Sequence, residues 1–127
     1  MVALGHHASG MMSNDEGLAG RVRAAGEKTG ERVWPLPLWE EYRDQIKSPV
    51  ADMKNTGGRP GGAETAAALL AAFAEGYPWV HLDIAGTARA AETRPYVPKG
   101  AVGVGVRLLV QLARDWEAPG DGARAGT

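Results

Sequence analysis

The 127-residue sequence contains no cysteine. This absence excludes a disulfide framework, a thiolate metal site and a cysteine nucleophile. An excess of charge of one sign is also missing, because 14 lysines and arginines stand against 15 aspartates and glutamates, for a formal net charge of −1. We therefore expect neither nucleic acid nor an anionic membrane as a partner.

Long apolar runs are missing as well. No stretch approaches the roughly 20 residues that a membrane-spanning helix needs. The first seven residues, MVALGHH, lack the basic region followed by an apolar core that a secretory signal has. Together with the absence of cysteine, this predicts a soluble protein of the reducing cytoplasm.

Glycine and proline, in contrast, are abundant. The chain has 18 glycines and 8 prolines, about a fifth of its residues against a usual share near 12%. Hydrophobic residues make up 44% and charged residues 23%, which is the composition of a folded chain and not of a disordered one. The length suits about one domain, and the many glycines and prolines suggest loops that shape a site.

Hydrophobic spacing predicts several helices along the chain. The first starts at a capping box formed by Ser13 and Glu16. The last carries a wide apolar face and is expected to be buried. The predicted helices cover residues 14–25, 39–47, 63–75 and 102–116.

Two strands are predicted, one over residues 2–5 and one over residues 80–84, where apolar side chains alternate with polar ones. Helices separated by strands indicate an α/β sandwich around a sheet. Two strands cannot cover four helices, so further strands are expected from another part of a longer chain or from a partner chain. Residues 85–100 are expected to form a long loop, and residues 117–127 a disordered tail.

Two groups of residues that contain histidine are candidates for a metal or catalytic site. His6 and His7 point to opposite faces if the segment is extended, so a loop pair without function is favoured over a metal site. His81 and Asp83 share one face of a predicted strand, where they could orient each other or a metal. Because a metal site needs three or four ligands, structural pairing is the preferred interpretation.

Two glycine-rich segments are candidates for phosphate binding. Residues 57–62 precede a predicted helix, where an anion could bind, but no Lys-Ser/Thr follows, and a tight turn is the alternative. Residues 100–105 fail the dinucleotide fingerprint because Leu108 stands where the third glycine belongs. No nucleophile elbow is present either. Composition and spacing therefore indicate an α/β protein without naming its function.

The order of several sequence blocks is more specific. The chain resembles the leucyl aminopeptidase (cytosol aminopeptidase) family from about residue 2 to residue 116. The blocks that carry the resemblance are VALG at 2–5, SND at 13–15, GERVWPLPL at 30–38, KSPVADMKN at 47–55, GG at 61–62, WVHLDIAGTA at 79–88, GA at 100–101 and GVR at 105–107.

The resemblance implies a dinuclear-metal exopeptidase that removes N-terminal residues, often leucine, from peptides. Two divalent cations, typically zinc, manganese or magnesium, would bind the substrate amino group and the attacking water. It also implies a hexameric assembly and a catalytic domain built as an α/β/α sandwich around a mixed sheet. Residues 1–116 would form the C-terminal third of that domain, a partial sandwich truncated on its N-terminal side.

The chain departs from the family in one respect. The family's metal-binding carboxylates and lysine, and its Asn-Thr-Asp-Ala-Glu-Gly-Arg signature with the catalytic arginine, lie upstream of the VALG block. Nothing in this sequence matches them, so we assign no catalytic and no metal residue and expect the chain alone to be inactive. The alternative is a non-catalytic short relative that binds or assembles with full-length aminopeptidase subunits.

The resemblance also implies which residues of this chain line a substrate pocket. Ala85, Gly86, Thr87 and Ala88 match the segment that lines the pocket for the N-terminal side chain of the substrate. Small residues at 85 and 88 would leave room for a bulky apolar side chain, although simple close packing is the alternative. Thr56 matches a position of the next subsite, where its hydroxyl leaves the residue preference open.

Overall fold

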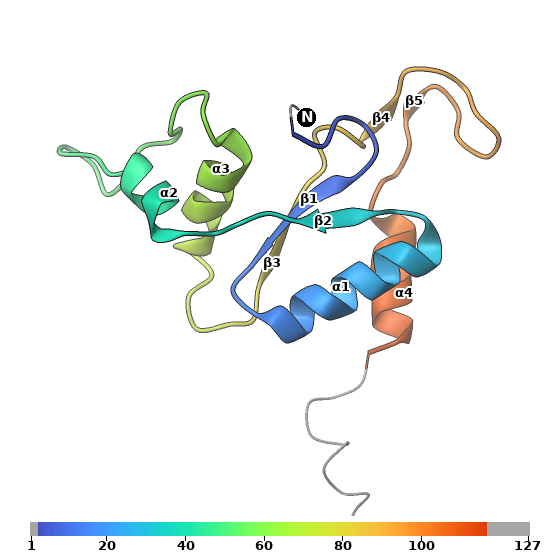
Figure 1. Cartoon of the computed structure of the whole chain (residues 1–127), viewed down its shortest axis with the longest axis horizontal. Helices are drawn as coiled ribbons and strands as arrows, with labels where there is room; N and C mark the ends of the chain where they lie inside the picture. The colour runs from blue at the N-terminus through green and yellow to red at the C-terminus, as the bar shows by residue number, and fades with distance from the viewer. Residues whose placement is uncertain (1–2, 117–127) are drawn as a thin grey trace, which may run out of the picture.

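A three-stranded mixed sheet lies at the centre of the chain. The computed structural model describes residues 3–116, so the tail predicted over 117–127 lies outside the described residues. The strand order is β2 (Val33–Pro35), β1 (Ser9–Ser13), β3 (Val80–Asp83). β1 pairs in parallel with β2 and antiparallel with β3. The α/β class and the mixed sheet predicted from the sequence are thereby confirmed (Figure 1).

The central strand β1 was not predicted from the sequence, and neither was its parallel neighbour β2. Ser9, Gly10, Met11 and Met12 are all buried, so the strand shows no alternation of polar and apolar residues. Serine and glycine also have low strand propensity. The strand predicted over residues 2–5 is wrong for the part described, because residues 3–6 form turns and Gly5 has a φ of 61°.

The first predicted helix exists, with different ends. α1 (Glu16–Thr29) begins after Asp15, whose side chain accepts a hydrogen bond from the Leu18 amide at 2.6 Å. The predicted cap, Ser13, instead donates its hydroxyl to the Trp79 carbonyl at 2.6 Å and so joins β1 to the start of β3. The helix ends at Thr29, four residues beyond the predicted end at 25, because the following Gly30 has a left-handed φ of 74°.

The remaining helices agree in type with the predicted ones and differ in length. α2 (Glu40–Gln45) and α3 (Gly62–Ala71) are shorter than predicted. α4 (Val106–Arg114) begins later than predicted, because Gly103 and Gly105 have φ values of 63° and 92° that a right-handed helix excludes. The loop expected over residues 85–100 contains one arm of a small hairpin, in which β4 (Arg89–Ala90) pairs with β5 (Gly100–Ala101).

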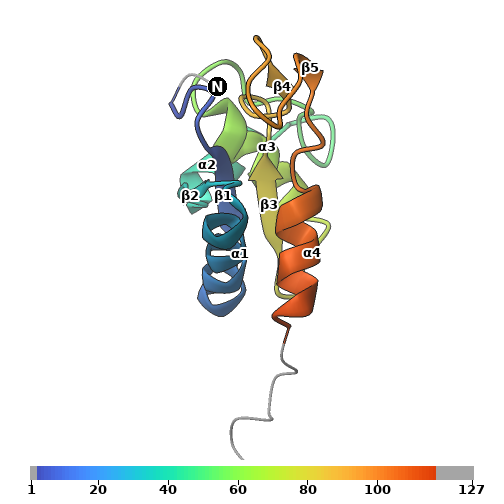
Figure 2. The same cartoon turned by 90° about the vertical axis from the view of Figure 1, so that its right-hand side faces the viewer.

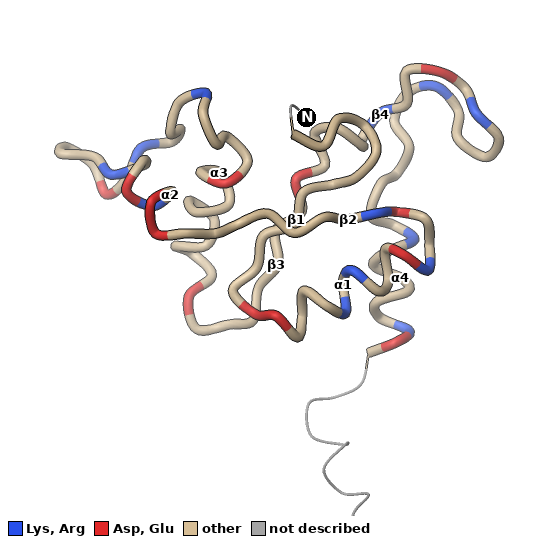
Figure 3. Tube along the Cα trace, in the orientation of Figure 1, with Lys and Arg blue, Asp and Glu red and all other residues tan. Residues whose placement is uncertain are grey.

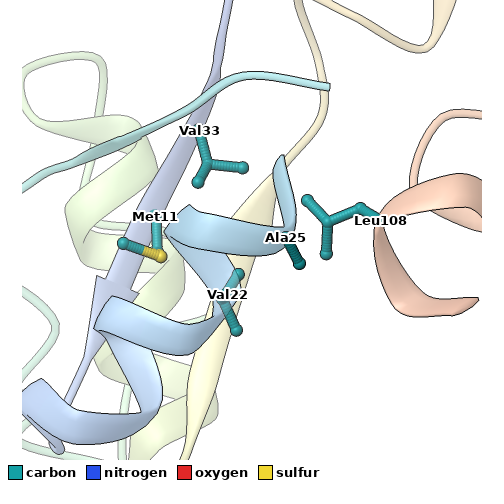
Figure 4. Packing of buried hydrophobic residues seen from close by; sticks show 5 residues of the cluster. All are labelled: Met11, Val22, Ala25, Val33 and Leu108. Carbon is teal, nitrogen blue, oxygen red and sulfur yellow. The ribbon is translucent and has the colours of Figure 1, made fainter. Parts of the chain in front are cut away.

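Helices cover both faces of the sheet. On one face α1 and α4 lie side by side (Figure 2), and their side chains pack with the strands in a core of Met11, Val22, Ala25, Val33 and Leu108 (Figure 4). On the other face α3 contacts β1 and β3. Successive strand residues point to opposite faces, so the fully buried Met12 faces the α3 side. The result is the layering of an α/β/α sandwich.

α4 is less buried than its sequence predicts. Leu108 is 1% exposed, but Val106, Leu109 and Val110 on the same helix are 62%, 57% and 52% exposed. The expectation of a buried helix is therefore wrong for the described residues, because only one side of its apolar face has neighbours.

Candidate functional site

A tight turn follows β3 and shapes residues 84–88. The Ile84 carbonyl accepts hydrogen bonds from the Thr87 amide at 3.0 Å and from the Ala88 amide at 2.9 Å. The Asp83 carboxylate accepts from the Ala85 amide at 2.9 Å. These three bonds hold the segment that carries four of the five predicted pocket residues.

The segment before β1 fastens this turn from the other side. His6 Nδ1 lies 2.7 Å from the Gly86 carbonyl oxygen. A carbonyl can only accept, so Nδ1 must carry the proton. The hydroxyls of Ser9 and Thr87 are 2.7 Å apart. His6 therefore anchors the turn and is not part of a free histidine pair, while His7 lies in a separate hollow with Arg23 and Trp34.

A cavity of about 510 Å³ lies between the turn, the start of β1 and the first turn of α3. Its volume falls within the usual range for small-ligand pockets. Leu4, Gly10 and Leu36 contribute apolar surface, and Gly86 lies on its wall. Its charged lining residues are Arg59, Glu64 and Asp83.

The structure distributes the predicted pocket residues unevenly. Gly86 lines the large cavity, and Thr87 lines a smaller one of about 180 Å³ with His6 and Arg89. Ala85 is exposed and Ala88 half-buried, and neither lines either of these two cavities. Thr56 is exposed in the loop between α2 and α3 and lies in neither cavity.

Sequence reasoning overlooked Arg59, Glu64 and Leu36 as residues of one cavity. Arg59 belongs to the glycine-rich segment 57–62, so the signal that could have found it was present. The Gln45 side chain fixes this segment by donating to the carbonyls of Gly57 and Pro60, both at 2.8 Å. Gly57 is needed there, because a Cβ at this position would lie 2.7 Å from Thr65 Cγ2.

His81 and Asp83 lie on one face of β3, as predicted. The His81 ring stacks on Trp79, with centroids 6.1 Å apart and an interplanar angle of 12°. Burial lowers the pKa of His81, and the nearby Asp83 carboxylate opposes that shift only in part. Within residues 3–116, no group of three or more histidine, cysteine, aspartate or glutamate side chains could hold a metal ion.

Charged residues are spread over the molecule. Figure 3 shows both signs in the half that carries α2 and α3 and in the half that carries α1 and α4. In the described part of the chain, no helix is long and apolar enough to cross a bilayer.

Comparison with known proteins identifies the family. The model of the cytosol aminopeptidase family, catalytic domain, matches residues 1–110. The chain belongs to the cytosol aminopeptidase family. Its members are metal-dependent aminopeptidases. The chain is 59% identical over 116 residues to a probable cytosol aminopeptidase of Roseiflexus castenholzii, covering 91% of this chain and 24% of that protein. A probable cytosol aminopeptidase of Geobacter sulfurreducens is 57% identical over 114 residues, with coverages of 90% and 23%.

Solved structures of this aminopeptidase family match as well. The bottromycin maturation enzyme BotP in complex with Mn superposes with a TM-score of 0.84 at 40% identity, covering 89% of this chain and 25% of that one. A mutant tomato leucine aminopeptidase gives a TM-score of 0.80 at 42% identity, with coverages of 88% and 21%. The chain thus spans about a quarter of the length of the curated cytosol aminopeptidases that it matches.

Proposed function

We propose that this chain forms the C-terminal wall of the substrate site in a leucyl aminopeptidase, a metal-dependent enzyme that hydrolyses N-terminal residues, often leucine, from peptides. The supporting observation is the hydrogen-bonded junction between the Gly86–Thr87 turn and two residues, His6 before β1 and Ser9 at its start, which borders the cavity of about 510 Å³. Residues 1–110, which match the family model, include this junction.

Within this proposal, Ala85, Gly86, Thr87 and Ala88 line the pocket for the substrate's N-terminal side chain, and Thr56 lines the next subsite. Ala85, Ala88 and Thr56 line neither cavity of this chain, so they would do so with the rest of the aminopeptidase domain in place. The turn after β3 gives the first four a defined backbone, because three hydrogen bonds hold it. Small side chains at 85 and 88 leave space for a leucine side chain. The hexameric assembly and the cytoplasmic location belong to the same proposal.

The two divalent ions, manganese, zinc or magnesium, do not fit the residues present. The large cavity holds only two carboxylates, Asp83 and Glu64, and Asp83 already accepts a hydrogen bond from the Ala85 amide. A divalent cation in a protein site needs more ligands than these two. The ions would therefore bind residues outside this chain, and we assign it no chemical step.

Activity measurements test the proposal. The purified chain with added Mn²⁺ or Zn²⁺ is expected not to hydrolyse a leucine anilide. A chimera in which this chain replaces the matching 116 residues of the Roseiflexus castenholzii relative is expected to hydrolyse it and to form hexamers. Hydrolysis by the chain alone that survives exhaustive purification would refute the first expectation, and a folded but inactive chimera would refute the second.

The alternative is a non-catalytic relative that assembles with full-length aminopeptidase subunits. The exposed apolar side chains of α4 favour it, since they offer a surface for another protein. Co-purification of this chain with the intact Roseiflexus castenholzii relative would support it. A stable monomer that does not bind the intact enzyme would argue against it.

A further inference from the structure

A second cavity, of about 290 Å³, lies between α1, the start of β2 and the segment before β1. We call it the basic hollow, after its lining residues His7, Arg23 and Arg32. Leu4 and Ala8 line both this hollow and the cavity of about 510 Å³, so the segment before β1 forms a wall between the two. On that wall the His6 side chain reaches the Gly86 carbonyl, whereas its neighbour His7 lines the hollow.

Positive charge in the basic hollow is not fully balanced. Two arginines, Arg23 and Arg32, stand against one glutamate, Glu27, which gives the lining a formal charge of +1 with His7 neutral. Glu27 Oε1 accepts a hydrogen bond from Arg23 Nε at 3.2 Å. Within residues 3–116, the side chains of Arg32 and His7 have no hydrogen-bond or ion-pair partner. The hollow therefore offers a free guanidinium and a ring N–H to an anion.

Trp34 adds an aromatic wall and holds the second guanidinium. Arg23 Cζ lies 5.0 Å from the centroid of the half-exposed Trp34 ring, which is a cation–π contact. Together with the bond from Nε to Glu27, this contact fixes Arg23 through two partners. The two terminal nitrogens of its guanidinium have no hydrogen-bond partner in the described part of the chain. Leu4 and Val33 complete the lining with apolar side chains.

We propose that the basic hollow binds a small molecule with one carboxylate on a branched apolar body. The carboxylate would accept hydrogen bonds from Arg23 and Arg32, and the body would lie against Leu4, Val33 and Trp34. A single negative charge balances the formal charge of +1, whereas a phosphate dianion would exceed it. The volume of about 290 Å³ lies at the lower end of the range for small-ligand pockets. The site does not rest on the proposed function, because all of its lining residues belong to this chain.

Titration of the full 127-residue chain with N-acetylleucine tests the site. Proton–nitrogen NMR follows the indole N–H of Trp34 and the Nε–H groups of Arg23 and Arg32, and all three are expected to shift in a saturable way. N-acetylleucinamide has the same body without the charge, and acetate has the charge without the body. Each is expected to bind about tenfold more weakly than N-acetylleucine, because it loses either the charged hydrogen bonds or the apolar contacts.

A matched pair of variants separates the hollow from the overall charge of the protein. Arg32→Gln is expected to weaken N-acetylleucine binding about tenfold, because the carboxylate loses a charged donor. Arg107→Gln removes the same charge from an exposed position on α4 outside the hollow and is expected to leave the affinity unchanged. Because both arginines are exposed, both variants should fold as the parent does, which circular dichroism checks.

Other results would overturn the site. If no saturable shift occurs at the three reporter groups, or if the two variants weaken binding equally, the hollow does not bind the carboxylate. If N-acetylleucinamide binds as tightly as N-acetylleucine, the guanidinium groups take no part. If acetate or inorganic phosphate binds as tightly, the hollow is an unselective anion site and the assignment to an apolar carboxylate is wrong.

Discussion

At the scale of single residues, Glu31 joins two parts of the chain that are far apart in sequence. Its carboxylate accepts hydrogen bonds from the Gly105 amide at 3.0 Å and the Leu108 amide at 2.8 Å. These amides belong to the start of α4, whose own N-cap is a glycine without a side chain. Glu31 therefore caps a helix from more than 70 residues away, and it also opposes the positive end of the helix dipole.

Removing this cap should destabilise the chain. Glu31→Ala is expected to lower the free energy of unfolding by about 1–3 kcal/mol, because two half-buried amides lose a charged acceptor. Glu27→Ala is the control, because Glu27 is exposed and only pairs with Arg23 at 3.2 Å; it should change stability by at most about 0.5 kcal/mol. Urea unfolding measures both, and equal losses would contradict the capping role.

His81 should make stability depend on pH. Burial lowers its pKa in the folded chain below the usual value of 6.5 that applies in the unfolded chain. The unfolded chain therefore binds more protons as the pH falls below about 6.5, and the free energy of unfolding falls with it. Above that pH this contribution is constant. Urea midpoints between pH 7.5 and 5.5 should show the decline, and His81→Gln should reduce it. An identical decline in the variant would exclude His81 as its source.

At the scale of elements, two of the three glycines of α1, Gly20 and Gly26, lie in different surroundings. A Cβ at Gly26 would lie 2.6 Å from the Glu31 carbonyl oxygen, whereas a Cβ at Gly20 would meet nothing within 4 Å. Gly26 thus lets the chain after the helix turn back closely against it, which keeps Glu31 and Leu108 in place. Gly20 has no such role and only weakens the helix.

This contrast predicts opposite effects of one substitution. Gly20→Ala should stabilise the chain by about 0.5–1 kcal/mol, because alanine favours helix over glycine. Gly26→Ala should destabilise it by about 1–3 kcal/mol, because the added methyl group forces the backbone apart. Thermal or urea unfolding of the two variants is a direct test. A gain in stability for both would show that the approach of Glu31 to α1 is not tight.

Sequence patterns were most reliable for elements with a local signal. The capping-box pattern before α1, the periodic spacing of α3 and the alternation in residues 80–84 predicted elements that the structure contains. β1 carries no such signal, because a short strand buried on both faces does not alternate. The ends of α4 were misplaced because the apolar spacing continues through Gly103 and Gly105, whose backbone conformation breaks the helix.

At the scale of the whole molecule, the described residues form a layered sheet with one side of α4 uncovered. The exposed side chains include Val106, Leu109 and Val110, together with Phe73 of the segment after α3. Apolar patches of this kind favour association in water. A sheet of only three strands also gives few long-range contacts that could make folding cooperative.

The isolated chain should therefore be marginally stable. We expect a broad thermal transition and self-association that grows with protein concentration, whereas the chimera with the Roseiflexus castenholzii relative should unfold at a higher temperature. Calorimetry combined with sedimentation velocity measures both properties. A sharp two-state transition in a monomer would show that the exposed α4 surface does not limit stability.

The five predicted pocket residues show what sequence motifs can and cannot predict about the site. Resemblance alone selected Ala85, Gly86, Thr87, Ala88 and Thr56, and the structure brings Gly86 and Thr87 against the start of β1 and the residues before it. Their contacts with His6 and Ser9 span about 80 residues. Neither composition nor local spacing contains that information, since it depends on how β1 and β3 pair.

The amino-acid sequence alone determined the α/β class and the type of those helices and strands that have a clear period. The order of its sequence blocks also determined the family. Folding in three dimensions was needed to make a central strand of the unpatterned residues 9–13 and to bring Glu31 to the start of α4. The reason is physical. Periodicity and capping act over a few residues, whereas strand pairing and side-chain caps join segments that meet only when the chain folds.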